Sequence, residues 1–256
     1  MLQIELLSHT ETERAATIFH RDGFVAIKDA LTPDQLKFAQ SGAQRIIKQQ
    51  TEATELEQAN RGFARYSFGD QIKHPEWSML IDLPTTLPIL DAIWNGPDYI
   101  CTGGGGDFSV PGAKIQPLHS DIGEFLHDPS GQVTFHDVPA PFIVINFLMT
   151  EFKKENGAIR FVPATQRSRH ASPKLEEEPE WMQNSIVCAP AGTAIIRDVR
   201  CWHAGTSNNS QEIRPMTSIG YYAPWFRSHS QQADLPMDVY QTFSPRAQEL
   251  CRFIAQ

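Results

Sequence analysis

The chain has 256 residues, 41% of them hydrophobic, and a formal net charge of −8. This length suits one β-barrel or sandwich with added helices, and the apolar fraction is sufficient for a sizeable core. The 22 basic residues are scattered and outnumbered by 30 acidic ones, a pattern that does not suit binding to a phosphate backbone. We therefore expect one domain over residues 1–256, with no nucleic-acid partner.

Neither the cysteines nor the chain start indicates export or membrane insertion. The four cysteines have no C-x-x-C spacing, which favours reduced thiols. No basic segment followed by a long apolar run stands at the N-terminus, and the stretch from Ala140 to Met149 is broken by Pro141 and Asn146. We expect a cytoplasmic protein without a signal peptide or membrane span; its oligomeric state is not determined by these features.

The first hundred residues predict helices around one strand. A helix is expected from Thr10 to His20, and Gly23–Lys28 has the composition of a strand. Thr32 to Gln35 then supplies a capping residue, a proline at the first helical position and a glutamine for a capping box. Helical spacing continues this second helix through Leu36, Ala39, Ala43, Ile46 and Ile47. The polar segment from Thr51 to Asp70 is compatible with the end of a helix followed by a loop.

Beyond residue 100 the pattern becomes that of an antiparallel β structure. Short extended runs alternate with turns rich in Gly, Pro and Asn. The fold class expected is mainly β with flanking helices, with a helical elaboration over about 10–100 and a β core over about 100–227. The predicted strands are Ile115–Leu118, Phe142–Met149, Ile159–Val162, Thr193–Ile196 and Met216–Tyr221.

One concentrated charge run, Glu176 to Glu180, interrupts this region. Such runs are usually solvated surface loops, and a mobile lid over a pocket is the alternative.

The pair His119-x-Asp121 is the main candidate for chemistry. Alternate side chains of an extended strand share a face, so this imidazole and carboxylate point the same way. His203, at the end of a predicted strand over Gly192–Val199, offers a second imidazole. The remaining histidines lack such spacing and are expected to be surface or core residues; they include His9, His20, His74, His170 and His229.

Two histidines and one carboxylate with open positions suit non-haem Fe(II) that activates oxygen, although zinc remains an alternative. Arg214 follows eleven residues after His203, and a guanidinium is the best partner for the distal carboxylate of a keto acid. If Arg214 continues on the strand after the turn over 207–210, it would lie beside the strand that carries His203. These residues together predict a site for iron and 2-oxoglutarate.

Five segments in order over roughly residues 15 to 227 resemble the phytanoyl-CoA dioxygenase family. Each is weakly specific alone, but jointly they are highly specific. One departure is Ala164-Thr165-Gln166, where members often have Gly-Ser-His, and this leaves the shape of the local loop open. The matching segments are Phe19–Val25, Gln116–Asp121, Glu155–Pro163, Trp202–Gly205 and Arg214–Pro215.

The resemblance implies a double-stranded β-helix, a jelly-roll, with iron bound by His119, Asp121 and His203. It also implies that Arg214 anchors 2-oxoglutarate. Gln116 is expected to donate its amide to this co-substrate, as the matching glutamine does in some members. Asn146 is a candidate for the same role, with a buried amide that satisfies nearby backbone as the alternative.

The implied reaction consumes O2 and 2-oxoglutarate, releases succinate and carbon dioxide, and hydroxylates a small molecule, with ascorbate as a supporting reductant. A carboxylate at Asp121 disfavours halogenation, since related halogenases have a small residue there. Desaturation, cyclisation and endoperoxidation use the same oxidant. The alternatives are a non-catalytic sensor that binds 2-oxoglutarate or metal, and a zinc hydrolase.

The substrate is the least determined part of the site. No basic cluster suited to a CoA phosphate is visible, so a small metabolite or natural-product intermediate is expected. The candidate substrate-binding residues are Arg61, Tyr66, Phe125 and Trp225, with ordinary packing as the alternative for each aromatic.

Overall fold

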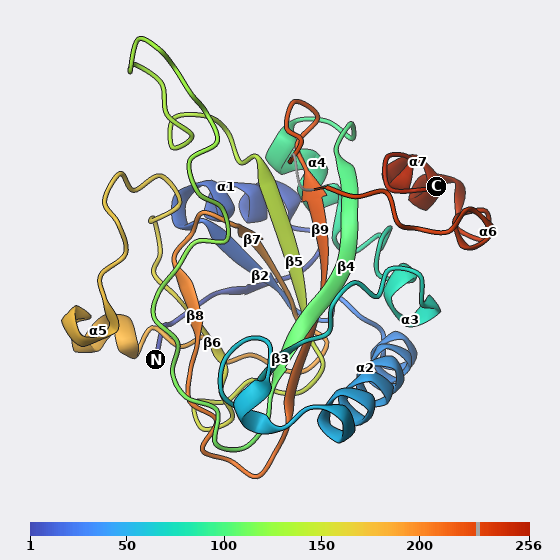
Figure 1. The fold of residues 1–256 in the computed structure, drawn as a ribbon. Coiled ribbons are helices and arrows are strands. Elements are labelled where there is room, and N and C mark those ends of the chain that lie inside the picture. The colour runs from blue at the N-terminus through green and yellow to red at the C-terminus, as the bar shows by residue number, and fades with distance from the viewer. Residues whose placement is uncertain (229–230) are drawn as a thin grey trace.

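A seven-stranded sheet forms the middle layer of the molecule in the computed structural model, which describes residues 1–228 and 231–256 (Figure 1). Its strands lie in the order β1-β2-β7-β5-β9-β4-β3, and every neighbouring pair is antiparallel except β1 with β2. His229, expected to be an ordinary surface or core residue, lies outside the described residues. The strand bounds are β1 Leu6–Leu7, β2 Phe24–Ile27, β3 Arg65–Ser67, β4 Ile100–Ser109, β5 Phe142–Leu148, β7 Ala194–Asp198 and β9 Arg214–Tyr222.

A second, two-stranded sheet pairs β6 (Ile159–Phe161) with β8 (His203–Gly205). Strand β2 lies between two hydrophobic clusters, because its alternate side chains enter different ones. Val25 and Ile27 pack toward the helices, whereas Phe24 packs with residues of the second sheet. The fold is therefore a mainly β, cupin-like jelly-roll with flanking helices, in agreement with the expected class.

The two N-terminal helices form where the sequence predicts them. α1 spans Thr12–Asp22 and ends at Gly23, which adopts a left-handed conformation. α2 spans Pro33–Ala53, and Thr32 and Gln35 form the reciprocal hydrogen bonds of a capping box. The other helices, several of which the sequence did not indicate, are α3 Pro75–Ser78, α4 Leu87–Trp94, α5 Glu180–Gln183, α6 Met237–Tyr240 and α7 Pro245–Cys251, with short 3-10 turns at Leu56–Gln58 and Leu175–Glu177.

Strand β4 contains four consecutive glycines, Gly103 to Gly106, a composition more typical of a turn. The reason is close packing of another chain segment on this strand. A Cβ on Gly105 would lie 2.5 Å from the carbonyl oxygen of Gly69, and one on Gly106 would lie 2.0 Å from that of Met216. Backbone hydrogen bonds from Phe68 and Gln71 to β4 carbonyls complete this contact, so only glycine fits here.

The predicted strand over Ile115–Leu118 is not a regular strand in the structure. The segment is extended and pairs only at its end, through an isolated bridge between His119 and His203. Its backbone still bonds to the second sheet, since the Gln116 N–H donates to the Gly205 carbonyl at 2.9 Å. It therefore lies along the edge of β8.

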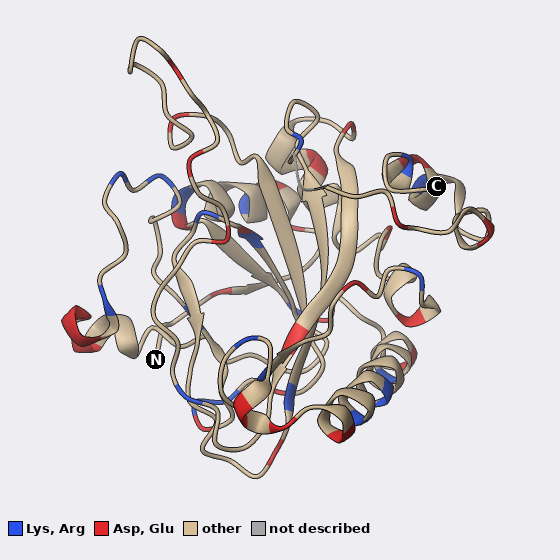
Figure 2. Cartoon of the chain, in the orientation of Figure 1, with Lys and Arg blue, Asp and Glu red and all other residues tan. Residues whose placement is uncertain are grey.

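Acidic and basic residues are interspersed along α2 and the connecting loops (Figure 2). Among the described residues, no helix is both long enough and apolar enough to cross a bilayer.

The packing on β4 makes Gly106 a sharp test of the fold. Gly106→Ala should lower the free energy of unfolding by at least about 1–3 kcal/mol, because φ is +120° at this position and the added methyl meets backbone. Gly123→Ala is the matched control, since nothing lies within 4 Å of its added Cβ. Urea unfolding of both variants measures the difference, and equal stabilities would contradict the packing described.

Candidate metal and co-substrate site

A cavity of about 670 Å³ opens at the main sheet and the edge of the second sheet. It is large enough for a small ligand with room for a second molecule, since ligand sites typically occupy about 300–1,000 Å³. Its wall holds the candidate iron ligands together with Arg214, Gln116 and Asn146. Further described residues that line it include Arg61, Arg65, Thr102, Gly103, Asp107, Phe142, Val144, Arg197, Ser218 and Tyr222.

The two histidines present their Nε2 atoms to the same point. The Nδ1 atom of His119 lies 3.1 Å from the Pro117 carbonyl oxygen, and that of His203 lies 2.9 Å from the Cys201 carbonyl oxygen. A backbone acceptor at Nδ1 fixes the tautomer in which Nε2 carries the free lone pair. Backbone bonds between the two residues in both directions, 3.1 and 3.0 Å long, hold the rings together.

Asp121 completes a three-residue cluster. Its Oδ1 lies 3.8 Å from His119 Nε2 and 3.5 Å from His203 Nε2, and one ligand atom from each residue lies within 4.8 Å of the others. This confirms that the sequence pattern brings the three side chains together. His203, however, begins the separate strand β8 instead of ending the strand before it.

The other oxygen of Asp121 faces a buried arginine. Arg197 Nη1 lies 2.7 Å from Asp121 Oδ2. Burial alone would raise the pKa of Asp121, but the charges of Arg197 and His203 hold it well below its usual value. The carboxylate is therefore ionised and available to a cation.

Arg214 is almost fully buried at the start of β9. Its Nε donates to the Gly157 carbonyl at 3.0 Å, and its Nη1 lies 2.9 Å from Asp107 Oδ1. Arg214 does lie on the strand after the turn, but this strand pairs with β4 and β5 of the main sheet and not with β8, which carries His203. The two residues nonetheless line the same cavity.

This end of the cavity carries an excess of positive charge. Burial and the neighbouring Arg214 lower the pKa of Arg65 to about 10, an effect that Asp107 opposes. Burial would raise the pKa of Asp107, but Arg214, Arg65 and Arg61 lower it. One carboxylate is thus surrounded by three guanidinium groups, which favours an additional anion.

The two amide candidates already hold protein partners. Gln116 accepts from the Gly205 N–H at 3.1 Å and donates to the Arg61 carbonyl at 3.2 Å, so one of its amide hydrogens is committed. Asn146 accepts at Oδ1 from Arg197 Nε at 2.9 Å. Both side chains line the cavity.

Of the four candidate substrate residues, Arg61 lies in the cavity wall and the three aromatics are absent from the described lining. Tyr66 is buried in the core, where it stacks on Phe108 and donates its hydroxyl to the Thr54 carbonyl. Phe125 packs on Phe135 and Phe226, and Trp225 is 49% exposed. Their positions do not support the expected contact with substrate.

The acidic run near residue 178 is not uniformly solvated, because Glu178 is buried and paired with Arg160. Glu178 Oε1 also accepts from the Leu118 N–H at 3.2 Å, and Arg160 Nη2 donates to the Gln116 carbonyl at 2.7 Å. The pair therefore fixes the backbone just before His119. Glu176 and Glu177 are exposed, as the surface-loop interpretation expects.

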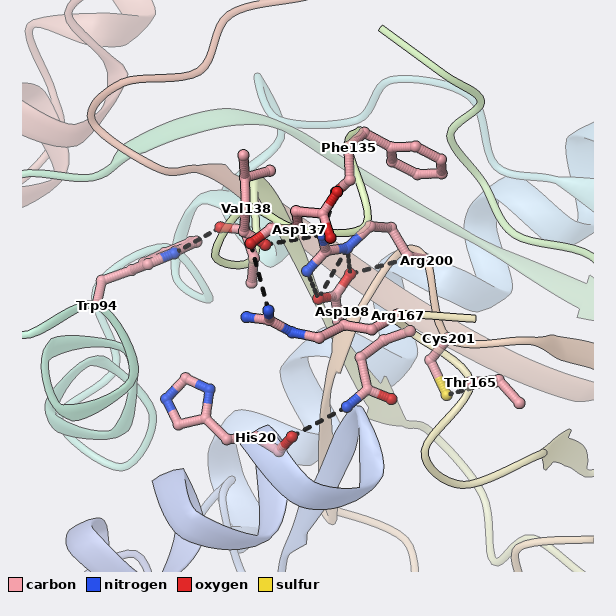
Figure 3. Close-up of polar contacts among 12 residues, drawn as sticks. His20, Trp94, Phe135, Asp137, Val138, Thr165, Arg167, Asp198, Arg200 and Cys201 are labelled. Carbon is pink, nitrogen blue, oxygen red and sulfur yellow. Dashed lines mark hydrogen bonds and ion pairs between the residues drawn. The ribbon is translucent and has the colours of Figure 1, made fainter. Parts of the chain in front are cut away.

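The turn before His203 is fixed by a second buried pair, Asp198 with Arg200 (Figure 3). Arg200 Nη1 donates to the carbonyls of Phe135 and Val138 at 2.6 and 3.0 Å, and so ties the long loop after Asp121 to this turn.

The segment Ala164-Thr165-Gln166, which departs from the family pattern, contributes to the same support. Thr165 accepts from the Trp202 N–H at 2.9 Å, and Gln166 donates to the His20 carbonyl at 3.0 Å. The loop therefore joins α1 to the residue before His203.

A jelly-roll with two histidines and one carboxylate at its cavity defines a class of metal-binding β proteins. Within that class, the chain matches the model of the phytanoyl-CoA dioxygenase (PhyH) family over residues 19–216 and belongs to this family.

Curated relatives of the chain are named dioxygenases. It is 28% identical over 178 residues to dioxygenase af480 of Aspergillus fumigatus, covering 68% of this chain and 54% of the relative. It is 23% identical over 252 residues to dioxygenase trt7 of Aspergillus terreus, covering 93% of this chain and 82% of the relative. The chain thus spans about half the length of the first of these proteins.

Solved structures share the fold at low identity. HygX from Streptomyces hygroscopicus, with nickel, 2-oxoglutarate and hygromycin B bound, superposes with a TM-score of 0.64 at 16% identity, covering 86% of this chain and 90% of HygX. The epimerase SnoN, in complex with Fe3+, alpha-ketoglutarate and nogalamycin RO, gives a TM-score of 0.64 at 16% identity, covering 83% of this chain and 84% of SnoN.

Removing the charge of Glu178 should destabilise the protein. Glu178→Gln leaves Arg160 as an unpaired buried cation, and we expect a loss of about 3–5 kcal/mol in the free energy of unfolding. Glu176→Gln, at an exposed position of the same run, should change it by less than about 0.5 kcal/mol. Urea unfolding compares the two, and a stable Glu178→Gln protein would show that the pair is not needed.

His119 should contribute to the pH dependence of the free energy of unfolding in the metal-free protein. Burial and the neighbouring His203 lower the pKa of His119 below 6.5. The unfolded chain therefore takes up this proton first, and the free energy of unfolding should fall as the pH drops from 6.5 toward the lowered pKa. Urea midpoints measured with a chelator across this range test the effect. His119→Gln should show a shallower dependence, and an unchanged slope would contradict the prediction.

Proposed function

We propose that this protein is a non-haem Fe(II)- and 2-oxoglutarate-dependent dioxygenase. The observation that carries the proposal is the cluster of His119, Asp121 and His203 on the wall of a cavity that also contains the buried Arg214. Two imidazoles and one carboxylate with open positions are the donor set typical of oxygen-activating non-haem iron. The curated relatives named dioxygenases support the same assignment.

The three ligands are each prepared for a metal by their own surroundings. The Pro117 and Cys201 carbonyls leave the Nε2 atoms of both imidazoles free to bind. Asp121 presents Oδ1 on the same side. Bound iron would supply oxygen activation, and 2-oxoglutarate would supply electrons through its decarboxylation to succinate and carbon dioxide.

The cationic end of the cavity suits the distal carboxylate of 2-oxoglutarate. Arg214 anchors this carboxylate in the proposal, and its guanidinium is already oriented by Gly157 and Asp107. Gln116 has one amide hydrogen left to donate to the co-substrate. Asn146 lies in the same wall, with its amide oxygen committed to Arg197.

The reaction proposed is hydroxylation of a small metabolite or natural-product intermediate. The cavity volume leaves room for such a molecule beside the co-substrate, and Arg61 is in position to contact an acidic group on it. Thr102, Ser218 and Tyr222 add polar side chains to the wall, which suits an oxygen-bearing substrate. Ascorbate is expected to support turnover by keeping the iron reduced.

Succinate release tests the reaction class without knowledge of the substrate. The purified protein with Fe(II), 2-oxoglutarate, ascorbate and oxygen should release succinate slowly, and His119→Ala should abolish that release because a ligand is lost. His9→Ala, at an exposed and distant histidine, is the matched control and should behave as the native protein. Succinate is measured by mass spectrometry.

The other outcomes of this assay identify the alternatives. Tight 2-oxoglutarate binding without turnover on a broad substrate panel would indicate a sensor. Native zinc with activity that survives without oxygen would indicate a zinc hydrolase. Either result would overturn the proposed function.

A further inference from the structure

We propose that Arg197 is a positioning residue that keeps Asp121 a one-oxygen ligand of the metal, and that Asn146 holds Arg197 in place. The inference rests on the proposed function, since it concerns the metal ligand Asp121. It assigns a role to a buried arginine that no motif in the sequence indicated.

The two oxygens of Asp121 face different partners. Oδ1 lies 3.5 and 3.8 Å from the two imidazole Nε2 atoms, whereas Oδ2 lies 2.7 Å from Arg197 Nη1. The arginine side chain is 8% exposed and that of Asp121 is 26% exposed, so the pair is partly shielded from water. One oxygen is thus directed at the metal position and the other is held away from it.

Asn146 fixes the arginine from the neighbouring strand. In the pairing of β5 with β7, Arg197 lies opposite Val144, so Asn146 is its diagonal neighbour on the same face. The Asn146 Oδ1 accepts from Arg197 Nε at 2.9 Å, and this side chain is 2% exposed. The guanidinium is therefore held at two points, Nε by the amide and Nη1 by the carboxylate.

This arrangement protects the open positions of the metal. A carboxylate that bound through both oxygens would occupy a position that a keto acid or oxygen needs. Because Oδ2 is engaged by Arg197, a turn of the carboxylate toward the metal would leave a buried guanidinium without its partner, which is costly. Among the described residues, Asp121 is the one carboxylate within 4 Å of Arg197.

The same residue contacts the cavity, so a direct contact with the co-substrate is the competing explanation. The two explanations differ in what happens to Asp121. If Arg197 positions the carboxylate, its removal changes metal ligation before any co-substrate is added. If Arg197 binds the co-substrate, metal ligation stays the same and only co-substrate affinity falls.

The test uses the full chain loaded with Co(II), a probe whose ligation is read by X-ray absorption or crystallography without turnover. We expect one-oxygen ligation by Asp121 in the native protein and two-oxygen ligation in Arg197→Gln. Arg197→Lys retains a cation near Oδ2 and should keep one-oxygen ligation. Arg45→Gln, which removes an arginine from a distant ion pair with Glu76, is the matched control.

Binding of 2-oxoglutarate to the same Co(II) proteins, measured by calorimetry, gives the second readout. Its Kd should rise on the order of tenfold in Arg197→Gln, because the second oxygen of Asp121 would compete for a position that the keto acid needs, and much less in Arg197→Lys. Asn146→Ala keeps both charges and should give a smaller rise with mixed ligation. Should Arg197→Gln not fold, Asn146→Ala decides the question.

Two results would overturn the inference. One-oxygen ligation in Arg197→Gln would do so whatever the Kd, and so would two-oxygen ligation with an unchanged Kd. A native protein that binds Co(II) but not 2-oxoglutarate would instead overturn the proposed function, since ligation by Asp121 is measured independently.

Discussion

Pairing between buried arginines and carboxylates is the interaction on which the site depends. Four such pairs support the site, two of them in the cavity wall, and in each the arginine side chain is at most 8% exposed. A buried guanidinium without a partner for its charge is strongly destabilising. The pairs therefore hold separate chain segments together. Three of them fix a metal ligand or the backbone beside one. They are Arg160–Glu178, Arg197–Asp121, Arg200–Asp198 and Arg214–Asp107.

The three pairs next to the metal ligands each act on a different part of the cluster. The Arg160 pair holds the backbone before His119, and the Arg200 pair holds the turn before His203 together with the loop after Asp121. Arg197 holds the carboxylate itself. The ligands lie on an irregular segment and a three-residue strand, which are weakly held by ladder hydrogen bonds alone. Precise placement must then come from side chains, and the buried pairs provide it.

The sequence predicted the cluster but not its supports, for a physical reason. Side-chain alternation places His119 and Asp121 on one face, and the motif around His203 is local, so both are visible in a short window. Ion pairs between buried residues are not, since Arg197 and Asp121 are brought together only by the fold. The acidic run illustrates this limit, because Glu178 is buried through its pairing with Arg160 of β6, whereas Glu176 is exposed.

The sequence likewise predicted the parts of the fold that have local signals and missed those that depend on contacts between distant segments. Capping residues and apolar spacing located α1 and α2, because those signals are carried within one helix. The glycine run of β4 does not predict a strand from the sequence. These glycines are required because backbone from other parts of the chain packs closely against β4. The separation of β8 and β9 into different sheets was also missed, which displaced Arg214 from its expected neighbour.

The distribution of charge connects these pairs to the proposed chemistry. Asp121 and Asp107, the carboxylates at the two ends of the site, are each already paired with an arginine, while Arg65 and Arg61 add positive charge beside Asp107. A divalent metal at the histidine cluster would raise the positive charge further. The cavity is therefore suited to an incoming dianion such as 2-oxoglutarate, whose two carboxylates can face the metal and Arg214. The positive excess is local, since Asp70 and Asp234 also line the cavity, and it therefore favours an anionic group at the Arg214 end in particular.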